Sequence, residues 1–254
     1  MADAKMIESH VDNGIAVLEI NRPPVNSYTT ELLKEFDAAI LDARFNDDVH
    51  ALVITGKVEK FFSAGADINM LSKQSLGFKN NFALHGHEVL MRLENTPKIV
   101  IAAINGHAVG GGLEIAMACD IRIASESARF CTQFIKLGIG GCDIGVSYTL
   151  PRIIGAGPAF DLILTARAVD ADEALRLGIV SRLSDTVVED ALAIAETLCG
   201  YGKFGVESTK QVMWANLEAG SLESALHLEN RSQILAGAGG MLSEATEAFR
   251  HRRR

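Results

Sequence analysis

The segment from Ile99 to Ala116 constrains this chain most, because an apolar run leads directly into three consecutive glycines. Gly110, Gly111 and Gly112 would weaken a helix or a strand, so their use must be to let the backbone approach something bulky. Glu114 is the single carboxylate in the apolar stretch that follows. Backbone N–H groups at a helix start are unpaired and partly positive, which suits an oxygen that becomes negative during a reaction. The segment therefore predicts a strand, a glycine turn and a helix that holds Glu114 beside a ligand. The alternative is a tight turn with a solvated glutamate.

The composition limits the class of protein. The chain has 254 residues, of which 48% are hydrophobic, so it can bury a sizeable core. Its formal net charge of -8 disfavours a general nucleic-acid or anionic-membrane surface, and with it RNA binding as a side activity. The four cysteines form no C-x-x-C pair, which fits reduced thiols and disfavours a zinc ribbon. Without a signal-like start or a membrane-length apolar run, the expectation is a cytoplasmic protein with no membrane partner.

Hydrophobic patterning divides the chain into two parts. A hairpin over residues 6–20 that turns at Asn13-Gly14, a helix capped by Thr29 or Thr30, and strands near 51–55, 98–104 and 120–124 predict an α/β core over residues 1–195. The polar residues 72–81 are expected to precede a helix that runs to about residue 95. Helical patterns dominate from about residue 158, where only residues 179–183 still predict a strand, and residues 196–254 are expected to form a C-terminal helical region. One late helix carries an apolar stripe that either faces another subunit or packs into the chain's own core: Leu222, Leu226, Ile234 and Leu235.

Several motifs occur in an order that resembles the enoyl-CoA hydratase/isomerase (crotonase) superfamily, from about residue 10 to the C-terminus. They are Asn21-Arg22-Pro23, Phe62 to Ile68, Ala102 to Gly106, Gly110 to Glu114, Cys119 to Ala124, Leu150 to Gly155 and Ala174 to Val180. The resemblance implies a crotonase-like spiral of ββα units with a C-terminal helical region that supports oligomerisation and closure over CoA. It also implies a homotrimer or a hexamer built as a dimer of trimers. The ligand would be an acyl-CoA thioester, with no cofactor beyond the CoA of the substrate and no metal.

The resemblance places the thioester oxygen between two backbone N–H groups, those of Ala66 and Gly111. Two preorganised donors stabilise the charge that develops on such an oxygen, by roughly 3 kcal/mol each. The expected CoA and substrate contacts are Val25, Ala64, Asp67, Ile68 and Phe134, with Phe249 and Arg252 closing over CoA, sometimes from a neighbouring subunit. Loop packing and a solvated helix end are the alternatives for these residues.

Proton transfer is where the chain departs from the family pattern. Glu114 matches one of the two catalytic glutamates of the family's hydratases, but the second position is Phe134, which cannot move a proton. Asp143 resembles the active-site aspartate of dienoyl-CoA isomerases and aryl-CoA dehalogenases, which makes it the candidate partner for Glu114. The alternative is that Asp143 caps a helix that starts near Ile144.

The sequence thus predicts an enoyl-CoA hydratase-like lyase that acts on an unsaturated acyl-CoA through an oxyanion hole and Glu114 with Asp143. Two other functions stay open. The chain could be an enoyl- or dienoyl-CoA isomerase, or a non-catalytic acyl-CoA-binding member of the family.

Overall fold

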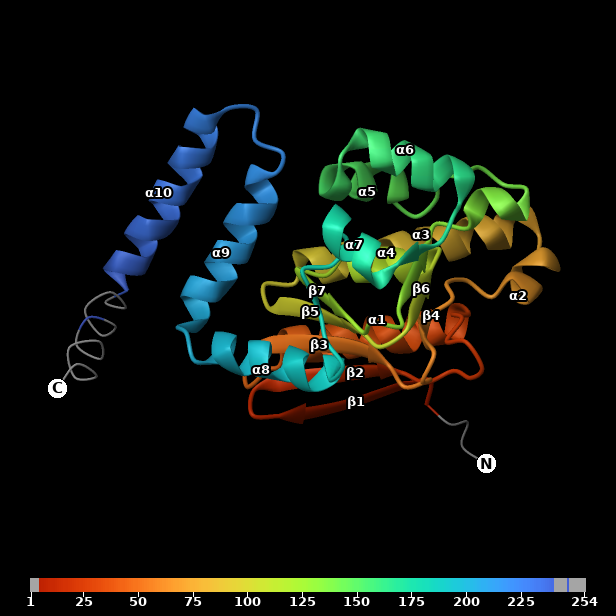
Figure 1. Ribbon diagram of the computed structural model, residues 1–254. Coiled ribbons are helices and arrows are strands. Elements are labelled where there is room, and N and C mark those ends of the chain that lie inside the picture. Colours follow the sequence, from red (N-terminus) through yellow and green to blue (C-terminus); the bar gives the residue numbers. More distant parts are fainter. Residues whose placement is uncertain (1–4, 240–245, 247–254) are drawn as a thin grey trace.

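The computed structural model describes residues 5–239 and 246, and a six-stranded sheet crosses its centre (Figure 1). β1 pairs antiparallel with β2 through a turn in which Asn13 and Gly14 both have positive φ, and the other neighbours are parallel. In spatial order the strands are β1 (Ile7–Asp12), β2 (Ile15–Ile20), β3 (Ala51–Gly56), β5 (Ile99–Ile104), β7 (Ile121–Ala124) and β10 (Arg182–Leu183).

A second, smaller sheet turns the chain into a spiral. Each of β3, β5 and β7 is followed by a short strand of this sheet and then by helical structure, which makes three successive ββα units. The predicted crotonase-like spiral is therefore confirmed. In spatial order the smaller sheet holds β4 (Phe61–Ser63), β6 (His107–Val109), β8 (Arg129–Cys131) and β9 (Val169–Asp170), the last one antiparallel.

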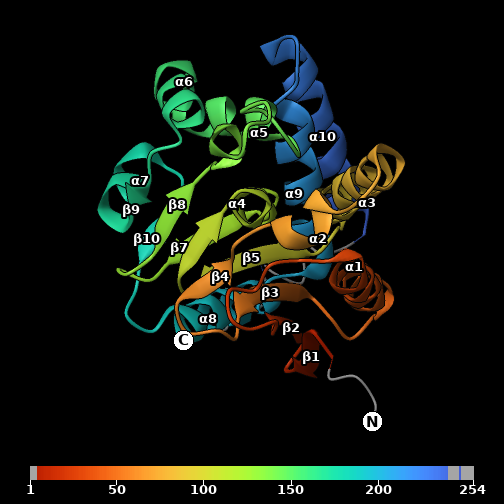
Figure 2. The ribbon, with the colours of Figure 1, turned by 90° about the vertical axis from the view of Figure 1, so that its right-hand side faces the viewer.

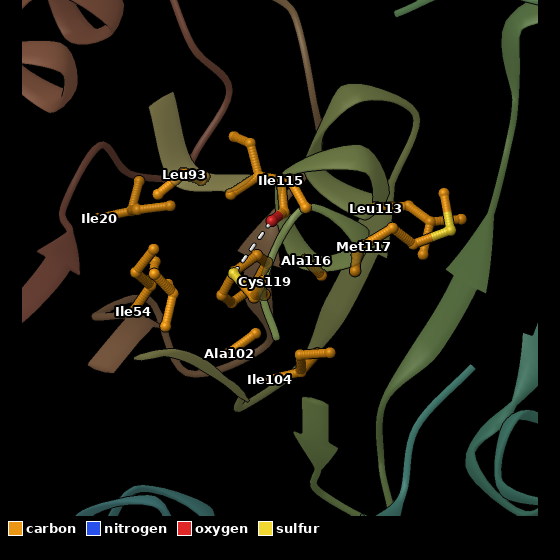
Figure 3. Packing of buried hydrophobic residues seen from close by; sticks show 14 of the residues in the cluster. Ile20, Ile54, Leu93, Ala102, Ile104, Leu113, Ile115, Ala116, Met117 and Cys119 are labelled. Carbon is orange, nitrogen blue, oxygen red and sulfur yellow. Dashed lines mark hydrogen bonds between the residues drawn. The ribbon is translucent and has the colours of Figure 1, made fainter. Parts of the chain in front are cut away.

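Alternation along the strands explains how helices cover both faces of the large sheet. Leu18, Leu52 and Val100 point into the main core, which α1 (Thr30–Phe45), α3 (Leu76–Asn95) and α4 (Gly111–Met117) close. Figure 3 shows the α4 end of this core, where the Cys119 thiol donates to the Ile115 carbonyl at 3.2 Å.

The intervening strand residues Val17, Val53 and Ile101 point to the opposite face and pack on α8 (Val187–Cys199) (Figure 2). The expected boundary between residues 195 and 196 falls inside this helix. The division into two domains itself stays a prediction.

The later helices surround one end of the spiral and then leave it. They are α5 (Val146–Ile154), α6 (Ala156–Thr165), α7 (Ala171–Leu177), α9 (Lys203–Asn216) and α10 (Leu222–Ala238), and the α9–α10 hairpin extends away from the body (Figure 1). The apolar stripe on α10 is 52–75% exposed within the single chain, so it does not belong to the chain's own core.

Two local expectations were wrong. Helix α3 begins at Leu76, inside the polar segment 72–81 that was expected to precede it, because Ser75 caps the helix by accepting from the Phe78 N–H. Residues 179–183 were expected to form a strand, but only Arg182 and Leu183 pair with β7. Within residues 5–239 and 246, no helix combines the length and apolar character needed to cross a membrane.

Candidate active site

Two segments that are far apart in the sequence bring the backbones of Ala66 and Gly111 together. Tyr28 forms a parallel bridge with Ala66, in which the Tyr28 N–H bonds the Gly65 carbonyl at 2.8 Å and the Asp67 N–H bonds the Tyr28 carbonyl at 3.0 Å. The bridge uses the Gly65 carbonyl and the Asp67 N–H. Because the Ala66 N–H lies opposite the Gly65 carbonyl across their shared trans peptide, it points away from Tyr28. Gly111 is the first residue of α4, and its N–H has no partner within that helix.

The glycines of this region are required by close contact. A Cβ on Gly111 would lie 1.8 Å from the Tyr28 hydroxyl, and one on Gly112 would lie 2.2 Å from the Ser63 carbonyl oxygen. Gly65 adopts φ +78°, and a Cβ there would lie 2.9 Å from the Gly111 nitrogen. The glycine turn therefore brings the two amide-bearing segments into direct contact.

Glu114 lies on the first turn of α4 and is 1% exposed. Its Oε2 accepts a hydrogen bond from the Thr149 hydroxyl at 3.0 Å, while Oε1 is buried with no partner among the described residues. Burial raises the pKa of Glu114 well above its ordinary value; the Thr149 hydrogen bond opposes the shift, and the charge of Asp143 adds to it. The solvated alternative for Glu114 is therefore wrong.

Two cavities adjoin at this place. The first, here called the Phe134 cavity, has a volume of about 520 Å³ and is lined by residues that include Tyr28, Ala66, Phe134 and Asp143. The second, the Glu114 cavity, has a volume of about 310 Å³, and Glu114, Met117, Thr149 and Trp214 are among its lining residues. His87 and Ile144 line both cavities, so these two side chains form the shared wall.

Asp143 does not cap a helix with its side chain. Helix α5 starts at Val146 and its N-cap residue Gly145 makes no side-chain bond, while the Asp143 carboxylate accepts from the neighbouring Ile144 N–H at 2.9 Å. Asp143 is exposed and lines the Phe134 cavity, whereas Glu114 lines the neighbouring one. Phe134 is buried at the start of a 3-10 turn, η1 (Phe134–Leu137), and its ring is the nearest group to a Cβ built on Gly110.

Of the expected acyl-CoA contacts, Ile68 and Phe134 line the Phe134 cavity, and Val25, Ala64 and Asp67 do not. Val25 accepts from the Ala64 N–H at 3.0 Å, and Ile68 is 51% exposed in the Phe134 cavity. Asp67 already has partners, because it caps α2 (Ile68–Ser72) and pairs with Arg22 at 2.8 Å. Phe249 and Arg252 lie outside the described residues. Within the described part of the chain, no group of three or more His, Cys, Asp or Glu side chains could hold a metal ion.

The sequence reasoning missed two residues of this region. Thr149 holds Glu114 from 35 positions further along the chain, and Tyr28 places its hydroxyl against Gly111. Neither residue belongs to a recognisable motif, and only the packing of α5 and of the 21–29 loop against α4 brings them to the site. The three adjacent glycines were the one available signal. They predicted that another group packs closely against this backbone, but not that the group is the Tyr28 side chain.

Comparison with known proteins identifies the fold and the family. Residues 10–254 match the family model described as enoyl-CoA hydratase/isomerase. A short-chain-enoyl-CoA hydratase of Clostridium acetobutylicum is 38% identical, with 86% of this chain and 84% of that protein aligned. A crotonyl-CoA hydratase of Syntrophomonas wolfei is 34% identical over 94% of this chain and 93% of its own length.

A solved structure from Mycobacterium abscessus, described as a probable enoyl-CoA hydratase/isomerase, superposes with a TM-score of 0.89. It is 36% identical and covers 97% of this chain and 96% of that one. The fold with its glycine turn and buried carboxylate is thus that of a crotonase-type enzyme. The chain belongs to the enoyl-CoA hydratase/isomerase family.

Proposed function

We propose that this protein hydrates the conjugated double bond of a trans-2-enoyl-CoA thioester. The observation that carries the proposal is the position of Glu114, a buried carboxyl group with an unpartnered oxygen, one helical turn from the Gly111 N–H. The Ala66 and Gly111 N–H groups would hold the thioester oxygen, which gains charge when water attacks C3. The hydratase names of the relatives support the same reaction.

The different environments of the two carboxyl groups suggest their roles. Burial favours the protonated form of Glu114, which suits a group that delivers a proton to C2. Asp143 faces solvent on the other side of the shared wall, which suits a base that takes a proton from the attacking water. The water oxygen would bond to C3, its proton would pass to Asp143, and C2 of the resulting enolate would take the proton of Glu114. A proton returning through solvent from Asp143 to Glu114 would restore both groups.

Double-bond isomerisation is the second candidate, and the two separate cavities favour it. Phe134 leaves no carboxylate at the second family position, and the Glu114 cavity is lined by Glu114, Glu94 and His87 but not by Asp143. A single buried group is enough to take a proton from one carbon and return it to another two carbons away. In that reaction Asp143 would have no chemical role.

We also propose that Val25, Ala64, Asp67, Ile68 and Phe134 contact the acyl-CoA, that Phe249 and Arg252 close over CoA, and that no further cofactor takes part. Binding measurements with saturated acyl-CoA test this part without turnover. Alanine at Ile68, which is half exposed at the rim, is expected to weaken binding severalfold, because it removes apolar area from the contact.

The deciding experiment follows the absorbance of the conjugated enoyl thioester. With trans-2-enoyl-CoA of several chain lengths, wild type is expected to remove the absorbance, and Glu114→Gln to reduce kcat by at least a hundredfold. Asp143→Asn is expected to do the same in a hydratase and to have little effect in an isomerase. Glu126→Gln, the same change in the exposed turn after β7, is the matched control.

Three outcomes distinguish a hydratase, an isomerase and a protein that only binds acyl-CoA. Conversion of 3-enoyl-CoA to the conjugated thioester, without hydration, would establish the isomerase. Hydration that survives in Glu114→Gln would contradict the proposed role of Glu114. Tight acyl-CoA binding with neither reaction would mean that the protein only binds its ligand.

A further inference from the structure

Tyr28 is held rigidly beside the Ala66 backbone. Its N–H and carbonyl are both engaged in the bridge that brackets Ala66, and its side chain is 4% exposed. The ring stacks on Phe82 with centroids 5.8 Å apart and planes inclined by 25°. Because both backbone and ring are fixed, the position of the hydroxyl is fixed too.

The hydroxyl of Tyr28 lies against the first residue of α4. It occupies the space where a side chain on Gly111 would begin, 1.8 Å from the position of that Cβ. Tyr28 and Ala66 line the same Phe134 cavity. The phenolic oxygen therefore lies against the Gly111 segment, while the Tyr28 backbone is paired with the Ala66 segment.

This hydroxyl has no partner of its own in the described part of the chain, and only burial and two carboxylates act on it. Burial raises the pKa of Tyr28, and the charges of Asp143 and Glu114 raise it further. The group therefore keeps its proton across the whole pH range in which a thioester survives. A neutral phenol at a cavity wall whose O–H makes no hydrogen bond can donate one to a ligand bound in that cavity.

We propose that the Tyr28 hydroxyl donates a hydrogen bond to the thioester carbonyl oxygen of the bound acyl-CoA, as a third donor beside the backbone N–H groups of Ala66 and Gly111. This deepens the proposed function and rests on it only in requiring that the ligand is an acyl-CoA thioester. A phenol is more acidic than a backbone amide, so its bond strengthens more as charge develops on the oxygen. Tyr28 would thus be a catalytic residue of either the hydratase or the isomerase.

The test reads the polarisation of the carbonyl directly, without turnover. The probe is a cinnamoyl-CoA with an amino group on its ring, whose absorption moves to longer wavelength when the carbonyl oxygen accepts stronger hydrogen bonds. Tyr28→Phe removes one oxygen atom and keeps the ring on Phe82, so it is expected to bind the probe with a clearly smaller red shift. Tyr201→Phe, the same change at a 61% exposed site, is the matched control and keeps the full shift.

Kinetics provide a second readout that a merely structural role would not give. Loss of a donor that acts mainly in the transition state is expected to lower kcat on the order of a hundredfold, with KM little changed. A Tyr28→Phe protein with a wild-type red shift, or with a raised KM and unchanged kcat, would overturn the proposal. If that variant does not fold, 3,5-difluorotyrosine at position 28 keeps the ring and strengthens the donor, and the red shift should increase; an unchanged shift overturns the proposal.

The outcomes also separate this inference from the proposed reaction. The wild-type protein could red-shift the probe but neither hydrate nor isomerise enoyl-CoA. That result would contradict the proposed function, and the red shift of Tyr28→Phe would still decide the role of Tyr28. If the wild-type protein binds the probe without a red shift, the site does not polarise the thioester carbonyl. That result would contradict the role of Tyr28 as a third donor as well.

Discussion

A single carboxyl group shows how strongly its surroundings set its chemistry. Glu114 is buried on a fully buried helix, with the Thr149 hydroxyl as its one hydrogen-bond partner among the described residues. The start of a helix would normally lower the pKa of a glutamate, and the sequence left the balance open. In the folded protein burial dominates, so the pKa of Glu114 is raised.

The raised pKa of Glu114 has a consequence for stability that does not depend on any substrate. The folded state keeps the Glu114 proton above the ordinary pKa of 4.5, whereas the unfolded state releases it there. The free energy of unfolding of wild type therefore falls as pH rises from about 4.5 through the folded-state pKa, by up to about 1.4 kcal/mol per pH unit. Glu114→Gln cannot release a proton, so its stability relative to wild type should increase across this window.

Urea unfolding of both proteins at a series of pH values measures this difference. Glu126→Gln, which changes an exposed glutamate, should run parallel to wild type. Parallel curves for Glu114→Gln and wild type would mean that the pKa of Glu114 is not raised in the folded protein.

At the scale of elements, helix α9 is attached to the core through buried charge. The Lys210 ammonium pairs with Asp120 at 2.8 Å and donates to the carbonyls of Leu93 and Lys98 at 3.1 Å each. The Trp214 indole N–H, one turn further on, donates to the same aspartate at 2.7 Å. No sequence pattern predicts this arrangement, because the residues come from α3, from the segments just before β5 and β7, and from α9.

Replacing Lys210 with Met is expected to destabilise the protein by about 3–5 kcal/mol, because Asp120, whose side chain is only 11% exposed, is left without its cation. Lys203→Met on the same helix is the matched control; Lys203 faces a fully exposed aspartate, and its loss should change the free energy of unfolding by less than about 0.5 kcal/mol. Denaturant unfolding of the two variants checks both values. Equal effects would show that the buried pair does not hold α9.

For the whole molecule, we expect the exposed stripe on α10 to lie in an interface between subunits. Leu222, Leu226, Ile234 and Leu235 are all more than half exposed, on a hairpin that stands away from the body (Figure 1). Apolar side chains gathered on one helix are typical of an interface between subunits. The expected state is the trimer, or the hexamer made from two trimers.

Leu235→Glu is expected to move the protein toward monomer, because it places a charge in the apolar contact. Light scattering coupled to size-exclusion chromatography measures the mass directly. Leu84→Glu, a similarly exposed leucine on α3, should leave the mass unchanged. A wild type that is already monomeric would contradict the assembly.

The sequence by itself determined the parts of this protein that depend on local pattern. Strand alternation, the Asn-Gly turn, the Thr29 cap and the glycine turn are local, and they correctly predicted the ββα core and the helix that carries Glu114. The polar residues 72–81 misled the same reasoning, because the Ser75 cap and contacts of Phe78 and Phe82 outweigh composition there.

Tertiary structure alone decided which groups meet. Burial raised the pKa of Glu114, the loop before α5 left the Asp143 carboxylate out of the helix cap, and the spiral placed the Tyr28 hydroxyl against Gly111. These properties depend on the desolvation of each group and on contacts between residues dozens of positions apart, and neither has a period or a spacing that a sequence can display.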